Sequence, residues 1–184
     1  MKEIFKLIKS DYKRYSGNSN IFYGGGGIWD ALSAKNECFA YTFWLRLASS
    51  RNIIIRLFAK QMHKRLSRKY GIQISPKMKL GYGLYISHAV SIVINPGTII
   101  GNNCNISQCV TIGSNHNTPA IIGDNVYIGP NVCIVENVRI GNNVTIGAGA
   151  VVVKDVPNDA TVAGVPAKVL NFKKPGRYIC NKFE

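Results

Sequence analysis

Two of the three histidines in this 184-residue sequence lie where an otherwise regular pattern is interrupted. His88 lies in the segment Ile86–Ser91 and His116 in the segment Ser114–Ala120, whereas His63 lies in a predicted helix. Imidazole titrates near neutral pH, so a histidine can take a proton from a hydroxyl group as a general base. Loops that interrupt a regular scaffold can be reshaped without damage to its core. We therefore interpret His88 and His116 as candidate catalytic residues.

Other chemistries find less support. The two histidines are separated and have no carboxylates near them, so we expect no metal site. No Gly-x-Ser-x-Gly segment indicates a serine nucleophile. The five cysteines contain no Cys-x-x-Cys pair, and an odd number without framework spacing is typical of a reducing cytoplasm. We expect a cytoplasmic protein, since no signal peptide and no membrane-spanning apolar segment is visible.

The pattern that the histidines interrupt has a period of six residues. Turn-forming glycine and asparagine follow each aliphatic position at fixed offsets, as in Val126–Asn131. The aliphatic positions form two series, namely Ile94, Ile100, Ile106 and Ile112, then Ile122, Ile128, Ile134, Ile140, Ile146 and Val152. Each hexapeptide predicts a short strand and a corner, and three of them close one triangular coil of a parallel β-helix.

Two other all-β architectures fit this pattern less well. An ordinary antiparallel β protein does not hold a six-residue register over this length. An ice-binding or purely structural β-solenoid would present regular outward ladders of Thr or Ser, whereas the outward positions here include Tyr127, Cys133 and Arg139.

The chain is expected to have three parts. These are an α-helical N-terminal region over residues 1–71, the β-helix over residues 72–157 and a C-terminal extension over residues 158–184. Helices are predicted over Lys2–Tyr15, Glu37–Ser49 and Asn52–Tyr70, the last followed by Gly71 as a C-cap.

Positive charge is concentrated in the helical part. Residues 1–80 hold 16 Lys and Arg against 4 Asp and Glu, residues 81–153 hold 1 against 2, and residues 154–184 hold 6 against 3. No nucleic-acid motif accompanies the charge, so we expect no nucleic-acid partner. An anionic lipid surface, an acidic or phosphorylated substrate and a merely solvated face all stay open. The basic helix Asn52–Tyr70 fits a peripheral membrane contact, but we prefer packing of its apolar stripe on a neighbouring subunit.

The segments Ile86–Ile94 and Ala163–Lys168, with the repeats between them, resemble the serine acetyltransferase branch of the hexapeptide-repeat acyltransferases. The resemblance covers about residues 70–170. It implies that the β-helix is left-handed, that the chain forms a homotrimer and that acetyl-CoA binds in the groove between two coils. The short basic helical front is similar to that of capsule- and exopolysaccharide-associated members of this branch.

The resemblance also implies roles for individual residues. His88 would take the proton from an acceptor hydroxyl, whose oxygen attacks the thioester of acetyl-CoA, and backbone N–H groups would stabilise the oxyanion. His116 of the adjacent subunit would orient the acceptor or the thioester. The residues implied to lie along CoA are Pro130, Ala148, Gly164 and Lys168, the last of them at a phosphate.

Departures from the family pattern guide the prediction of the acceptor. Serine acetyltransferases have Asp directly before the catalytic histidine and a second histidine directly before a proline; this chain has Ser87 and Thr118 there. Its helical region is also much shorter. We therefore expect an acetyl-CoA-dependent O-acetyltransferase that acts on a hydroxyl of a sugar or polysaccharide precursor. The alternatives are a serine O-acetyltransferase of cysteine biosynthesis and a non-catalytic β-helix scaffold.

Overall fold

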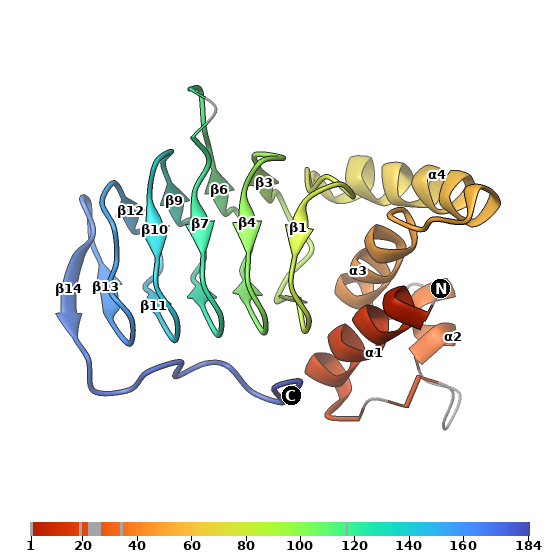
Figure 1. Cartoon of the computed structure of the whole chain (residues 1–184), viewed down its shortest axis with the longest axis horizontal. Coiled ribbons are helices and arrows are strands. Elements are labelled where there is room, and N and C mark those ends of the chain that lie inside the picture. The colour runs from red at the N-terminus through yellow and green to blue at the C-terminus, as the bar shows by residue number, and fades with distance from the viewer. Residues whose placement is uncertain (1, 19, 22–26, 34, 117) are drawn as a thin grey trace.

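A computed structural model describes residues 2–18, 20–21, 27–33, 35–116 and 118–184. Short parallel strands form a three-sided coil, and helices lie at its N-terminal end (Figure 1). The first sheet contains β1 (Lys79–Leu80), β4 (Ile99–Ile100), β7 (Ile121–Ile122) and β10 (Arg139–Ile140). The third contains β3 (Val93–Ile94), β6 (Thr111–Ile112), β9 (Cys133–Ile134) and β12 (Val151–Val152).

The second sheet is longer than the other two because it continues past the last complete coil. It contains β2 (Tyr85–Ile86), β5 (Asn105–Ile106), β8 (Tyr127–Ile128) and β11 (Thr145–Ile146), followed by β13 (Thr161–Ala163) and β14 (Lys168–Asn171). β13 pairs in parallel with β11, and β14 returns antiparallel to β13. The predicted parallel β-helix, with one strand and one corner in each hexapeptide, is confirmed.

The six-residue period fills the core of the coil. In each two-residue strand the second side chain points inward, and these aliphatic side chains stack in three columns that are buried except at Leu80 of the first coil. Ile86, Ile106, Ile128 and Ile146 form one such column and are each fully buried. Burial of one such side chain stabilises the fold by about 1.5–3 kcal/mol, so the repeat is the main source of stability in the coil.

The corners use asparagine and glycine for different reasons. Asn103, Asn125 and Asn143 adopt positive φ of 52–56° at successive coils, a conformation that asparagine tolerates. Gly129, at the corner after β8, does not have a positive φ. A Cβ atom placed on Gly129 would lie 2.8 Å from the backbone oxygen of Ile146. Glycine is therefore needed there because the neighbouring coil is too close for a side chain.

The helical region is larger than predicted by one element. Its helices are α1 (Lys2–Ser16), α2 (Gly27–Leu32), α3 (Glu37–Leu47) and α4 (Ile53–Tyr70). Asn52 caps α4 by accepting from two backbone N–H groups, and Gly71 ends it with a φ of 67°, as predicted. No helix in the described ranges is long and apolar enough to cross a membrane.

Part of the apolar side of α4 packs within the chain, and the contact that we predicted with a neighbouring subunit stays a prediction. Ala59, His63 and Leu66 lie on one side of α4 and are buried against α3 of the same chain. His63 Nε2 lies 3.0 Å from the Tyr41 hydroxyl of α3. The reason is local: the connection between α3 and α4 is short, so the two helices pack on each other directly.

A buried polar junction attaches the helices to the first coil. The Arg46 guanidinium of α3 binds both carboxylate oxygens of Asp11 of α1, at 2.8 and 3.0 Å. It also donates to the carbonyl oxygens of Leu80 and Gly81, while Asp11 accepts from the Leu84 N–H. Burial raises the pKa of the Asp11 carboxyl, and the Arg46 guanidinium opposes that rise. Charged groups this deep persist only when paired in this way.

The C-terminal tail runs back along the coil toward the helices (Figure 1). The Tyr178 ring packs on Tyr127, and the Phe183 ring stacks on Tyr82 of the first coil. Asn103 exchanges two hydrogen bonds with the backbone of Phe183. The tail therefore covers the asparagine corner between the first and second sheets.

Candidate functional site

His88 lies in the irregular corner that joins β2 to β3. The corner has two residues more than a regular one, and its imidazole is exposed. Within the residues that the structure describes, the His88 ring makes no hydrogen bond or ion pair. A free, exposed imidazole at a fixed backbone position can accept a proton from a bound hydroxyl group.

Two helical residues fix the backbone that leads to His88. The Tyr15 hydroxyl accepts from the Ile86 N–H at 2.9 Å and donates to the Ile86 carbonyl at 3.3 Å. The Cys38 thiol lies 3.6 Å from the carbonyl oxygen of Ser87 and can donate to it. Burial raises the pKa of Cys38 to about 11, so this thiol stays protonated near neutral pH. The helices thus position the corner that carries His88.

The predicted CoA residues follow His88 along one edge of the coil, between the second and third sheets. We call this edge, which carries His88, Pro130, Ala148 and Gly164, the His88 edge. Backbone hydrogen bonds join its successive corners, including Asn131 N–H to Gln108 O at 3.1 Å and Gly149 N–H to Pro130 O at 2.8 Å. The Gly164 carbonyl accepts from the Val151 N–H at 3.0 Å.

A basic pocket lies on the second sheet, near the far end of the His88 edge. Its volume is about 440 Å³, and Ala148 lines it together with Thr145 and Thr161. The C-terminal tail supplies three cations to its wall, namely Lys173, Lys174 and Arg177. The predicted Lys168 is exposed at the start of β14 and does not line this pocket.

His116 lies in the loop between β6 and β7, which projects beyond the coil (Figure 1). Its Nδ1 lies 2.7 Å from Oε1 of Glu136, and its backbone N–H donates to Oε2 at 2.8 Å. The Asn115 N–H also donates to Oε2, at 2.6 Å. These hydrogen bonds, led by that of His116, lower the pKa of Glu136 to about 2. Because an ionised carboxylate only accepts hydrogen bonds, Nδ1 of His116 carries the proton in this contact.

The two candidate histidines do not meet within one chain. His88 lies at the edge between the second and third sheets, whereas the His116 loop leaves the edge between the third and first sheets. The third sheet therefore separates them. A pocket of about 520 Å³ lies on that sheet beside the loop, lined by Gln73, Thr111 and Asn115 among others.

Sequence reasoning did not identify several residues that shape this site. Glu136 holds the His116 loop, and Tyr15 and Cys38 hold the His88 corner. Glu136 lies in the corner one coil after the loop that carries His116. This position is the only sequence feature that points to it. The predicted roles of His88, His116, Pro130, Ala148, Gly164 and Lys168 stay predictions. Among the described residues, no three His, Cys, Asp or Glu side chains gather as a metal site.

The chain is similar to several known proteins. Residues 119–154 match the family described as bacterial transferase hexapeptide (six repeats). A serine acetyltransferase from Synechococcus elongatus is 41% identical over 105 residues, which are 54% of this chain and 43% of that protein. The chain thus spans less than half the length of this curated relative.

Solved structures extend the similarity to most of the chain. A Neisseria gonorrhoeae serine acetyltransferase in complex with serine matches with a TM-score of 0.68 and 33% identity, over 91% of this chain and 69% of that one. A Brucella abortus serine acetyltransferase in complex with coenzyme A matches with a TM-score of 0.70 and 28% identity, over 92% and 67%. These likenesses confirm the predicted left-handed β-helix with a helical N-terminal region.

The prediction of a sugar or polysaccharide acceptor is wrong. These relatives and neighbours are serine acetyltransferases, and the similarity to capsule-associated members finds no support among them. The prediction gave weight to three departures, at Ser87, at Thr118 and in the length of the helical region. The short helical region nevertheless superposes with serine acetyltransferases, because matches over more than nine-tenths of the chain include it.

Proposed function

The chain belongs to the hexapeptide-repeat transferases, and on this premise we propose that it is a serine O-acetyltransferase with acetyl-CoA as the donor. The observation that carries the proposal is the similarity to serine acetyltransferases over more than nine-tenths of the chain, which includes structures bound to serine and to coenzyme A. The exposed imidazole of His88 supports it, since direct acetyl transfer to a hydroxyl requires a base.

The reaction we propose is a direct transfer without a covalent enzyme intermediate. His88 takes the proton of the serine hydroxyl while the hydroxyl oxygen attacks the carbonyl carbon of the thioester. The C–O bond forms, and the negative charge moves to the carbonyl oxygen, where backbone N–H groups stabilise it. The intermediate collapses with cleavage of the C–S bond, and protonated His88 returns the proton to the leaving sulfur. The products are O-acetyl-L-serine and CoA.

The complete site in this proposal lies between two subunits of a homotrimer. His88 and His116 flank the third sheet from opposite edges, so the His88 edge of one subunit can face the His116 loop of the next. The acceptor then lies between His88 and the pocket beside that loop, which Gln73, Thr111 and Asn115 line with polar groups. Glu136 holds the loop, and His116 Nε2 faces the acceptor as an orienting group.

CoA is proposed to lie along the His88 edge. From the His88 corner to Gly164 the edge crosses four strand spacings of about 4.8 Å, or about 19 Å, a length suited to the extended pantetheine arm. Pro130 and Ala148 lie between these ends, where the arm passes. Lys168, just beyond Gly164, supplies a cation to a CoA phosphate, as does the adjacent basic pocket with Lys173 and Arg177.

The test compares acceptors under saturating acetyl-CoA. Thiol release is followed with L-serine, with N-acetylglucosamine and with L-alanine, and the product with L-serine is identified by mass spectrometry. L-Alanine is the matched control, because it keeps the ammonium and carboxylate groups of serine but lacks the hydroxyl. We expect O-acetyl-L-serine, a kcat/KM for serine at least about tenfold above that for the sugar, or roughly 1.4 kcal/mol, and background release with alanine.

Two outcomes would overturn this assignment. A kcat/KM for the sugar equal to or above that for serine would show that the acceptor is wrong. No thiol release with any acceptor, together with no binding of acetyl-CoA in calorimetry, would favour a non-catalytic scaffold.

A further inference from the structure

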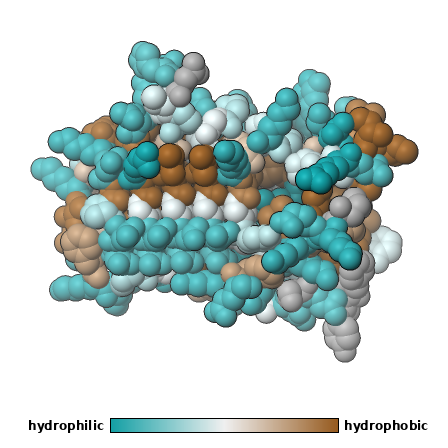
Figure 2. All heavy atoms as spheres, in the orientation of Figure 1, coloured by the Kyte–Doolittle hydropathy of each residue, from teal (hydrophilic) through white to brown (hydrophobic). Residues whose placement is uncertain are grey.

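An apolar cluster is exposed on the first two turns of α4. The exposed fractions are 53% for Ile53, 76% for Ile54, 60% for Leu57 and 63% for Phe58. Spacings of three and four residues bring these side chains together on the helix surface. Hydrophobic atoms gather at the end of the molecule where α4 begins (Figure 2). We call these four residues the α4 tip.

The α4 tip does not belong to the core-facing side of the helix. That side carries Ala59, His63 and Leu66, which α3 already covers. With 3.6 residues per turn, Ile54 and Leu57 point away from it, toward solvent. The same outer face carries Lys64 and Arg68 in the later turns, and both are exposed. Along its length, the outer face of α4 therefore changes from apolar to basic.

The sequence around the α4 tip contains no acidic residue that could offset its positive charge. No Asp or Glu occurs between Glu37 and Asp124, whereas residues 51–71 alone hold seven Lys and Arg. A groove of about 660 Å³ lies between α4 and the first coil. Arg56, Lys60 and Lys77 line it, and the first two flank Leu57 and Phe58 in the sequence. An apolar surface thus adjoins a cationic groove that is large enough to admit a phosphate group.

We propose that this face of α4 docks on an anionic lipid membrane. The α4 tip inserts among the acyl chains at the interface, Arg56, Lys60 and Lys77 bind headgroup phosphates, and the later basic turns lie over the lipid surface. Peripheral binding of this kind needs both buried apolar area and attraction to anionic lipid, and the structure provides both. The contact places the enzyme at the membrane surface, a property that acetyl transfer to serine does not require.

A second copy of the chain fits this face less well than lipid does. Two copies that paired through the α4 tip would bring Arg56, Lys60 and Lys64 of one chain toward the same residues of the other. Residues 51–71 contain no Asp or Glu that could offset this repulsion. A negatively charged lipid surface reverses the sign of that interaction, and charge complementarity therefore favours lipid.

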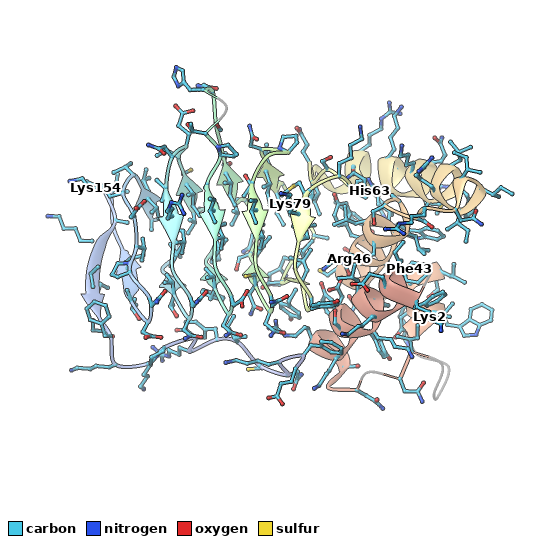
Figure 3. The ribbon with its side chains drawn as sticks, viewed as in Figure 1. Lys2, Phe43, Arg46, His63, Lys79 and Lys154 are labelled. Carbon is cyan, nitrogen blue, oxygen red and sulfur yellow. The ribbon has the colours of Figure 1, made fainter. Side chains whose placement is uncertain are left out.

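Co-sedimentation of the full chain with vesicles tests the proposal. We expect binding to phosphatidylcholine vesicles that contain phosphatidylglycerol, much weaker binding to phosphatidylcholine alone, and loss of binding as salt concentration rises. The variant Ile54→Ser/Leu57→Ser removes apolar area, and Lys60→Gln/Lys64→Gln removes two charges. Each lost charge should weaken binding to anionic vesicles about fivefold. Lys154→Gln, at the opposite end of the coil (Figure 3), is the matched control and should bind like the wild type.

The proposal fails if the wild type does not sediment with anionic vesicles at low salt, or if both double variants bind as the wild type does. It also fails if Ile54→Ser/Leu57→Ser lowers the molar mass in light scattering but leaves vesicle binding unchanged, since the face would then join copies of the chain. The rate of serine acetyl transfer in solution should stay near the wild-type value for each variant. That result would show that the variants are folded.

Discussion

At the scale of single residues, the structure distinguishes the two candidate histidines by what surrounds them. His116 is held by Glu136 through its ring and its backbone, whereas the ring of His88 has no bonding partner in the described part of the chain. The Glu136 carboxylate fixes the orientation of the His116 ring, whereas the His88 ring is positioned through its backbone corner alone. In the proposed reaction His88 is the base and His116 is the orienting residue.

The variant Glu136→Gln tests the orienting role. It keeps the size of the side chain but loses the negative charge that accepts from His116 and Asn115, so the loop should become less ordered. We expect the KM for serine to rise several-fold, with a smaller fall in kcat. Limited proteolysis should cut the variant faster within the loop. A variant with wild-type KM and unchanged proteolysis would show that Glu136 does not position the loop.

Sequence reasoning succeeded for residues that belong to the repeat and failed for residues that act across it. The inward column through Ile106 and Ile128 and the positive φ of Asn125 follow from local rules, since each depends on its own hexapeptide. Tyr15 and Glu136 act through contacts over 71 and 20 residues, and no local pattern encodes such pairs. The acceptor was mispredicted because local departures at Ser87 and Thr118 were given more weight than the similarity of the whole chain.

At the scale of elements, the Asp11–Arg46 pair joins α1 and α3 to the coil. Arg46→Met should lower the free energy of unfolding by about 3–5 kcal/mol, because it leaves the buried Asp11 carboxylate and two coil carbonyls without their partner. Urea denaturation followed by circular dichroism measures the change. The double variant Asp11→Leu/Arg46→Met should be more stable than Arg46→Met alone. A double variant that is less stable than the single one would contradict this account.

The contact between α3 and α4 predicts acid sensitivity. Burial lowers the pKa of His63 to about 4, against an ordinary value of 6.5, so the unfolded chain binds this proton more tightly than the folded one. Neutral, buried His63 therefore contributes fully to the free energy of unfolding above about pH 6.5. This contribution is lost as the pH falls toward 4, by up to about 3 kcal/mol. His63→Gln, which can still bond to the Tyr41 hydroxyl, should flatten this part of the stability curve. If the free energy of unfolding of the variant falls equally steeply with pH, the effect belongs to other groups.

At the scale of the whole molecule, the proposed site requires a second subunit. The third sheet separates the His88 edge from the His116 loop in each chain, so one chain presents two incomplete halves. Light scattering at assay concentration should give a mass three times the 20.2 kDa of one chain. A fully active species of 20.2 kDa would rule out the shared site.

The central claim is that His88 is the base in acetyl transfer to serine. The most direct measurement is the rate of O-acetyl-L-serine formation by His88→Ala and by the wild type, at saturating acetyl-CoA and with acetyl-CoA affinity measured in parallel. We predict a kcat lower by about 10²–10⁴-fold with unchanged affinity and the wild-type mass and circular dichroism spectrum. A folded His88→Ala protein that forms O-acetyl-L-serine at close to the wild-type rate would contradict the account.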